Sequence, residues 1–256
     1  MLGLHPADAR ELAYYSEVWD TKMGNPKSTQ EYTWAQPGLQ QSIHALTGGN
    51  QPAEVFKSAL MFLNNDGSCE SDGMALHRYG DSYAHSLLDN GSIMYGRDGY
   101  TTEHATAIES DNTLTGTRPD KIFERPELYL NYVQDLANLI STKYSEGNID
   151  GLDLCKFEEM VSFASTNQCS LIGIINYEIA AYTGENSFYV SQPLGYVPSK
   201  SAHLEHIENT KKYLGEKGVS FSTEEVYQTT VKKLFGFIKI KSKTYLGTKF
   251  NIEAND

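Results

Sequence analysis

Three side chains that can bind a metal ion recur at every fourth residue between positions 77 and 85. Residues four apart lie one turn apart on the same face of an α-helix, so His77, Asp81 and His85 are predicted to form one row. Imidazole nitrogens and carboxylate oxygens are ligands that zinc accepts, and a zinc site takes three or four protein ligands. The row therefore predicts a metal site that neighbouring helices must complete.

Two other interpretations of this row remain open. Asp81 and a histidine can form a solvent-exposed ion pair, which contributes little to stability, or His77 can be a hydrogen-bonded core residue. The rest of the predicted helix is apolar, and a polar row inside an apolar helix needs partners or a metal ion. That apolar background favours the metal site, and it consists of Met74, Leu76, Tyr79, Tyr83, Ala84, Leu87 and Leu88.

The composition argues against one class of partner. The chain has 256 residues and a formal net charge of -12, from 33 acidic and 21 basic residues. Proteins that bind duplex nucleic acid through its phosphates carry a basic surface, so duplex DNA or RNA is not an expected partner. The length suits one large domain or two small ones.

Neither a disulfide framework nor an export signal is visible. The three cysteines are far apart and form no Cys-x-x-Cys pair, so no thiolate zinc site is predicted. The first residues lack the charged and apolar regions of a signal peptide, and no apolar run is long enough for a transmembrane helix. We therefore expect a cytoplasmic protein or one exported by a specialised secretion system.

Apolar periodicity predicts helices through most of the chain. A long segment at 89–124, rich in Gly, Ser, Thr and Asp, is expected to form a functional or flexible loop, and the alternation in residues 237–241 predicts a short β segment. The predicted fold is all-α, a single multi-helix domain over residues 1–256, with the metal site in 1–150 and a second helical layer in 151–256. Its helices are expected at 6–23, 37–46, 52–64, 72–88, 126–145, 153–167, 169–183, 200–217 and 222–236.

Further ligands are predicted outside the row. Asp20 ends the first predicted helix and His44 ends the second, where a side chain can face a shared cleft. His104 lies in the long loop, which is expected to cover the cleft as a lid or to supply an extra ligand. A cluster of lysines near the end of the chain is expected to solvate a helix and tail, with a membrane- or partner-facing role as the alternative; it comprises Lys232, Lys233, Lys239, Lys241, Lys243 and Lys249.

The order of these ligands resembles the zinc-dependent phospholipase C and single-strand nuclease superfamily, whose members are all-helical metallohydrolases. The resemblance covers about residues 5–120. It implies that one or more zinc ions are bound, and that Asp20, His44, His77 and Asp81 hold the first of them. It also implies that Asp81 bridges to a second metal.

Histidines that follow the helix pair in that superfamily serve the other metals, which implies metal-binding roles for His85 and His104. In this chain His85 follows Asp81 by a single turn, closer than in the superfamily. The segment from Gly99-Tyr100 to Arg125-Pro126-Glu127-Leu128-Tyr129 also resembles uncharacterised bacterial helical proteins, some of them toxin-like.

These residues together predict a metal-dependent hydrolase of phosphoesters. Zinc lowers the pKa of a bound water to about 7, and Asp20 or Asp81 is expected to accept a proton from the attacking water. The acidic charge favours a lipid or small-molecule phosphoester over a polymeric nucleic acid. The alternative is a non-catalytic helical interaction module, such as an immunity, adaptor or secretion-associated protein, whose histidines are structural. The predicted substrate-binding residues are Arg78, Arg97 and Tyr83.

Overall fold

Helices dominate the part of the chain that the computed structural model describes, which comprises residues 4–22, 41–86, 122–144, 154–168, 171–191, 200–234 and 238–253. The chain divides into two compact units, Met1–Ser165 and Thr166–Asp256. A small three-stranded sheet lies in the second unit. The all-α prediction is confirmed in part, because the described residues are mostly helical but include this sheet near the C-terminus.

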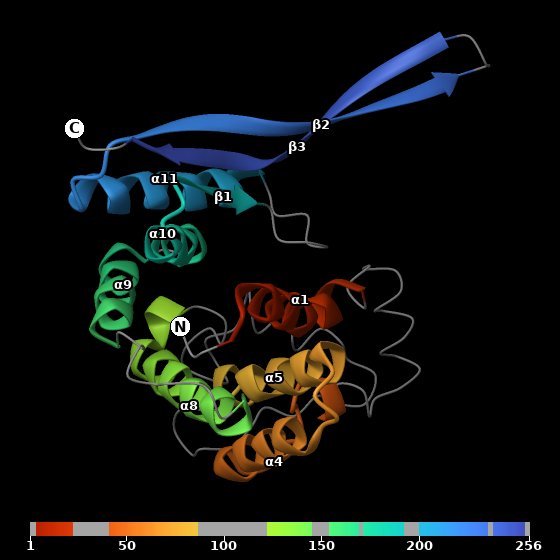
Figure 1. The fold of residues 1–256 in the computed structure, drawn as a ribbon, viewed down its shortest axis with the longest axis vertical. Helices are drawn as coiled ribbons and strands as arrows, with labels where there is room; N and C mark the ends of the chain where they lie inside the picture. The colour runs from red at the N-terminus through yellow and green to blue at the C-terminus, as the bar shows by residue number, and fades with distance from the viewer. Residues whose placement is uncertain are drawn as a thin grey trace. The chain divides into compact units, whose positions relative to one another are not determined.

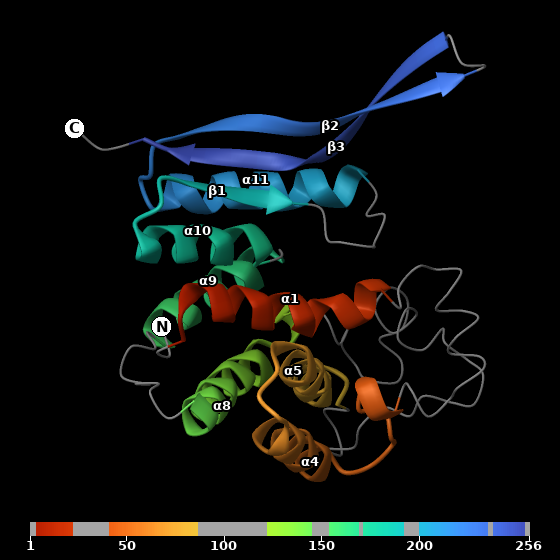
Figure 2. The ribbon, with the colours of Figure 1, turned by 45° about the vertical axis from the view of Figure 1, so that its right-hand side comes forward.

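The first unit is a helical bundle around a central helix, α5 (Figure 1, Figure 2). This helix packs against α1, α4 and α8. Ser68 caps its N-terminus by accepting a hydrogen bond from the Ser71 amide, and Asn50 caps α4 in the same way through Ala53. The elements are α1 (Pro6–Lys22), α4 (Gln51–Asn64), α5 (Cys69–Ala84), the 3-10 helix η1 (Ile122–Glu124), α8 (Pro126–Tyr144) and α9 (Leu154–Asn167).

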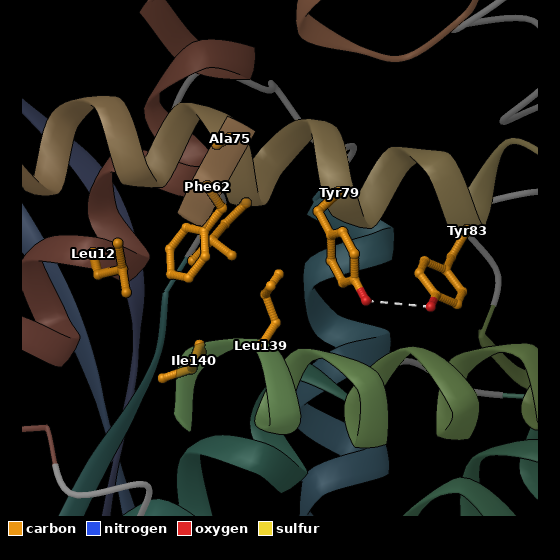
Figure 3. Packing of buried hydrophobic residues seen from close by; sticks show 8 residues of the cluster. Leu12, Phe62, Ala75, Tyr79, Tyr83, Leu139 and Ile140 are labelled. Atoms are coloured by element: carbon orange, nitrogen blue, oxygen red, sulfur yellow. Dashed lines mark hydrogen bonds between the residues drawn. The ribbon is translucent and has the colours of Figure 1, made fainter. Parts of the chain in front are cut away.

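Apolar packing fixes the rotation of α5 about its axis. Phe62 from α4 and Ala75 from α5 are completely buried, and Tyr79 and Tyr83 face α8, with their hydroxyls 3.3 Å apart (Figure 3). Because the apolar residues occupy this side of α5, the row at 77, 81 and 85 lies on a different side. The buried cluster comprises Leu12, Phe62, Ala75, Leu76, Tyr79, Tyr83, Leu139 and Ile140.

A glycine allows α1 to cross α5 at short range. A Cβ atom added at Gly73 would lie 2.4 Å from the Tyr15 Cβ and 2.6 Å from its carbonyl carbon. We expect Gly73→Ala to destabilise the protein by about 1–3 kcal/mol, because overpacking that displaces backbone outweighs the gain of about 1 kcal/mol in helix propensity. Urea unfolding measures the change.

The matched control lies on the same helix. A Cβ added at Gly80 would meet the Tyr132 hydroxyl at 3.5 Å, which is an ordinary contact. We therefore expect Gly80→Ala to leave the free energy of unfolding unchanged or to raise it slightly. Equal midpoints for the two variants would contradict the close crossing of α1 and α5.

The second unit places two helices against a sheet with the strand order β1-β3-β2. All strand pairs are antiparallel, with Phe188 opposite Phe250 and Phe221 opposite Ile252. Its core contains Val190 and Phe250 from the sheet and Leu214 from α11, all 1 % exposed or less. The elements are α10 (Ile172–Thr183), β1 (Ser187–Ser191), α11 (Lys200–Glu216), β2 (Phe221–Leu234) and β3 (Ile238–Ile252).

The helix predicted over 222–236 is wrong, because this segment is strand β2. Its Thr, Val and Tyr residues favour extended structure, and every residue from Phe221 to Leu234 pairs with β3. The short β segment predicted at 237–241 is the start of β3, which continues to Ile252. The second unit is therefore not an all-helical layer.

None of the helices in the described part of the chain combines the length and the apolar character that spanning a membrane requires.

Candidate metal centre

The row of potential ligands on α5 occupies the last two turns of the helix. His77 and Asp81 lie within α5, and His85 is its C-terminal cap residue, with its amide donating a hydrogen bond to the Asp81 carbonyl at 2.9 Å. The His85 side chain is 1 % exposed. The spacing seen in the sequence thus becomes one ridge of three side chains at the end of α5.

His44 comes to this ridge from a different segment, the short stretch before α4. Ile43, His44, Ala45 and Leu46 are all buried, so apolar packing on either side fixes the position of the imidazole. Ala45 has a φ of 54°, which is uncommon for a residue other than glycine. Such backbone conformations cluster at functional sites, where the surrounding structure maintains them.

The three ligand atoms converge on one point. His44 Nδ1 lies 2.7 Å from Asp81 Oδ2 and 3.0 Å from His77 Nε2, and His77 Nε2 lies 3.4 Å from the same Asp81 oxygen. A tetrahedral zinc ion with bonds of about 2.0–2.1 Å separates its ligand atoms by roughly 3.3 Å. The spacing of this group, which could hold a metal ion, therefore fits a small divalent cation with modest side-chain adjustment.

Burial favours a bound cation over a solvated ion pair. The side chains of His44, His77 and Asp81 are 9 %, 8 % and 14 % exposed. A carboxylate and two imidazoles removed from water in this way need compensation by protons or by a metal. The solvent-exposed ion pair considered from the sequence is therefore excluded, whereas a hydrogen-bonded set of structural histidines and a metal site both remain consistent with the geometry.

Asp81 stays ionised in this environment. Burial alone would raise the pKa of its carboxyl group, but the charge of His77, the hydrogen bond with His44 and the charges of His85 and His44 hold that pKa well below its usual range. An ionised carboxylate among imidazoles supplies the negative charge that a divalent cation requires.

The two oxygens of Asp81 face different histidines. Oδ2 is directed to His44 and His77, while Oδ1 lies 3.7 Å from His85 Nε2. A carboxylate placed in this way can bind one cation through each oxygen. The geometry is thus compatible with a second metal position between Asp81 and His85.

Sequence reasoning missed two residues that support this end of α5. The buried Arg125 guanidinium donates hydrogen bonds to the carbonyls of Ala84 at 2.6 Å and Ser86 at 2.8 Å, on either side of His85. The Tyr132 hydroxyl lies against Gly80 of α5, and burial, followed by the charges of Tyr129, Tyr79 and Asp81, raises its pKa, so it stays neutral. The sequence placed Arg125 before Pro126 at the start of a helix, within the segment that resembles bacterial helical proteins, but gave no sign of its contact with the end of α5.

Two predicted substrate-binding residues, Arg78 and Tyr83, are buried in contacts with neighbouring helices. The Arg78 guanidinium is 3 % exposed, pairs with Glu54 Oε2 at 2.5 Å and donates a hydrogen bond to Ser58. Tyr83 is buried, and its hydroxyl donates to Asp135 Oδ2 at 2.6 Å. These side chains are held in contacts with α4 and α8, and their predicted substrate-binding roles stay predictions.

The remaining predicted residues fall outside what the structure describes. Arg97 and His104 lie in the segment 87–121, outside the described residues. Asp20 belongs to α1, but only its backbone is described. Their proposed roles as metal ligands or phosphate-binding residues therefore stay predictions.

Comparisons with protein-family models, with curated proteins and with solved structures find no match to this chain. The function must therefore be argued from the chemistry of the site.

Proposed function

We propose that the protein is a metal-dependent hydrolase of phosphoesters that binds zinc at His44, His77 and Asp81. One observation carries the proposal, namely the convergence of two imidazole nitrogens and one carboxylate oxygen from separate segments within 2.7–3.4 Å of one another. The resemblance of the ligand order to the zinc phospholipase C and nuclease superfamily points in the same direction.

The donor set suits a catalytic zinc site better than a purely structural one. Structural zinc sites use four protein ligands, usually rich in cysteine, whereas catalytic sites use three ligands and leave a position for water or substrate. No cysteine belongs to the group of His44, His77 and Asp81. Zinc bound there would supply a water whose pKa is near 7 and a positive charge for a phosphoryl oxygen.

Side chains of the protein would hold the cation and accept the proton. His44 and His77 orient the cation, and Asp81 Oδ2 neutralises part of its charge. Asp20 stays the candidate for accepting a proton from the attacking water, because the pKa of Asp81 is held well below its usual range and its Oδ1 faces His85. Asp20 and His104 stay candidates for completing the site, and His85 for holding a second zinc ion.

The proposed substrate is a lipid or small-molecule phosphoester. The net charge of -12 repels a polymeric polyanion, whereas one phosphate group can be neutralised locally by the metal. Arg97 stays a candidate for binding that phosphate.

The first test is metal content combined with turnover. We expect protein purified without added metal, and then supplied with zinc, to hold about one equivalent or more of zinc, because three protein ligands are already grouped. Elemental analysis measures this content. A panel of p-nitrophenyl phosphomonoesters, phosphodiesters and phosphatidylcholine, assayed with zinc and with a chelator, measures hydrolysis.

The two measurements separate the proposal from its alternative. Chelator-sensitive hydrolysis supports the enzyme. Zinc binding without turnover on any substrate favours the non-catalytic helical module, in which the same histidines are structural. A zinc content below about a tenth of an equivalent after zinc addition would contradict the metal site itself.

A further inference from the structure

Basic residues are segregated into the C-terminal hairpin. Residues 226–252 contain six lysines and no acidic residue, although the whole chain has a net charge of -12. The lysines interpreted from the sequence as solvating a helix and tail lie instead on strands β2 and β3, at positions 232, 233, 239, 241, 243 and 249. The hairpin is therefore the one strongly basic stretch of this acidic sequence.

The distal half of this hairpin is a two-stranded arm, formed by residues 227–234 and 238–245. β1 pairs with β3 only between Gly247 and Asn251, so the arm continues beyond the third strand by roughly 25 Å at about 3.3 Å per residue. Figure 1 and Figure 2 show the two strands extending past the end of α11.

A β-bulge marks the start of the arm. Val226 pairs with Gly247 and Tyr227 with Tyr245, so Leu246 is the extra residue. Bulges increase the local twist and redirect the strands. At this junction the Tyr245 hydroxyl lies 2.9 Å from His203 Nε2 of α11, which anchors the base of the arm.

The register gives the arm two different faces. Lys233 pairs with Lys239, and the positions of Lys241 and Lys243 lie on the same face because alternate residues share a face. Positions on the other face include Leu234 opposite Ile238 near the end of the arm, and Lys232 opposite Ile240. The arm thus combines a basic face with apolar positions near its end.

Where the arm begins, the side chains on its basic face are accessible to solvent. Tyr227 is 45 % exposed, Lys241 and Lys243 are exposed, and Lys243 Nζ lies 5.8 Å from the centre of the Tyr227 ring. Lysines directly opposite each other, as at 233 and 239, destabilise a strand pair, and a two-stranded ribbon alone is marginally stable in water. A partner that neutralises the lysines would relieve both effects.

We propose that this arm docks onto an anionic lipid surface. Lysines near such a surface interact with the acidic head groups, while apolar residues enter the boundary between head groups and acyl chains. Duplex nucleic acid would engage the basic face but offers nothing to the apolar positions. Lysines at strand edges can also prevent aggregation, but glutamates would serve that purpose equally well, and the arm has none.

The test is co-sedimentation of the full-length protein with lipid vesicles. We expect binding to phosphatidylcholine vesicles that contain roughly 30 % phosphatidylserine, weakening at high salt, and no binding to pure phosphatidylcholine. The triple variant Lys239→Glu, Lys241→Glu, Lys243→Glu should lose affinity roughly tenfold or more. Because glutamate keeps the strands charged, this variant preserves protection against aggregation.

A matched variant controls for net charge. Lys211→Glu, Lys212→Glu, Lys217→Glu changes the same number of charges on α11 and its end, and should bind vesicles nearly as well as the wild type. Circular dichroism and size-exclusion chromatography check that both variants fold. If the arm triple variant misfolds, the milder Lys241→Gln, Lys243→Gln pair replaces it, because both side chains are exposed.

Failure of the vesicle-binding test can be distinguished from failure of the hydrolase proposal, because vesicle binding does not need the metal and should persist when a chelator is present. Equal binding by the arm and control variants would overturn the proposal, as would absence of wild-type binding to the anionic vesicles. Retention on duplex DNA with no retention on vesicles would also overturn it and would assign the arm to nucleic acid.

Discussion

Asp81→Asn is expected to abolish phosphoester hydrolysis and to lower zinc affinity by roughly tenfold to a hundredfold. The amide side chain keeps the shape of the carboxylate but lacks the charge that balances the cation. Isothermal titration with zinc and the phosphoester panel measure the two effects, and circular dichroism checks that helicity is kept.

Asp135→Asn is the matched control. This carboxylate also lies in the first unit and accepts a hydrogen bond from the Tyr83 hydroxyl at 2.6 Å, but it does not belong to the candidate ligand group. Its substitution should leave zinc affinity and turnover close to wild type. Full hydrolysis by a folded, zinc-loaded Asp81→Asn protein would count against the proposed site.

Arg78→Met is expected to lower the free energy of unfolding by about 3–5 kcal/mol. Arg78 and Glu54 form a buried pair whose side chains are 4 % and 6 % exposed. Removing the guanidinium leaves the Glu54 carboxylate buried, with Lys57 at 2.9 Å as its remaining charged partner among the described residues. Urea unfolding monitored by circular dichroism measures the loss.

Two comparisons test whether the buried charge causes this loss. Lys57→Met, at a side chain 60 % exposed, should change stability by less than about 1 kcal/mol. The double variant Glu54→Leu, Arg78→Met should be more stable than Arg78→Met alone, because no unpaired charge remains. A double variant no more stable than the single one would show that packing, and not charge, dominates.

Acid should weaken the same pair. Burial raises the pKa of Glu54, but the hydrogen bonds and charges of Arg78 and Lys57 outweigh it, so the folded-state pKa lies below the ordinary value of 4.5. A group with a lowered folded-state pKa stabilises the protein above its unfolded-state pKa, and this contribution is lost as the pH falls through the folded value. The stability difference between wild type and Arg78→Met should therefore shrink below about pH 4.5.

The helical part of the fold could be predicted because its signals are local. Pro126 opens a helix, and the apolar spacing between residues 51 and 64 and between 126 and 144 matches the observed helices closely. The segment 221–234 was predicted wrongly because its local spacing of apolar residues also fits a helix, and no Asn-Gly or Asp-Gly turn signal separates it from the next strand. Tyr227, Val231 and Leu234 fit the i, i+4, i+7 spacing of a helix, and pairing with β3 selects the extended form.

The candidate site was predictable in part for a similar reason. The spacing of His77 and Asp81 is fixed within one helix, so their proximity follows from the sequence alone. The sequence does not give the rotation of α5 against its neighbours, which places Arg78 against α4 and Tyr83 against α8. The contact of Arg125 with the end of α5 joins residues about 40 positions apart, so no local sequence pattern indicates it.

The position of the ligands at the C-terminal end of α5 has an electrostatic consequence. The aligned peptide dipoles of a helix place roughly half a negative elementary charge at that end. Asp81 and His85 lie there, at the last turn and the cap, so the backbone itself contributes an attractive potential for a cation. Arg125 neutralises part of that potential through the Ala84 and Ser86 carbonyls. If the same His and Asp ligands were placed in the first turn of α5, the positive end of the helix dipole would repel the cation. They would then bind a divalent ion less tightly, even with the same metal–ligand distances.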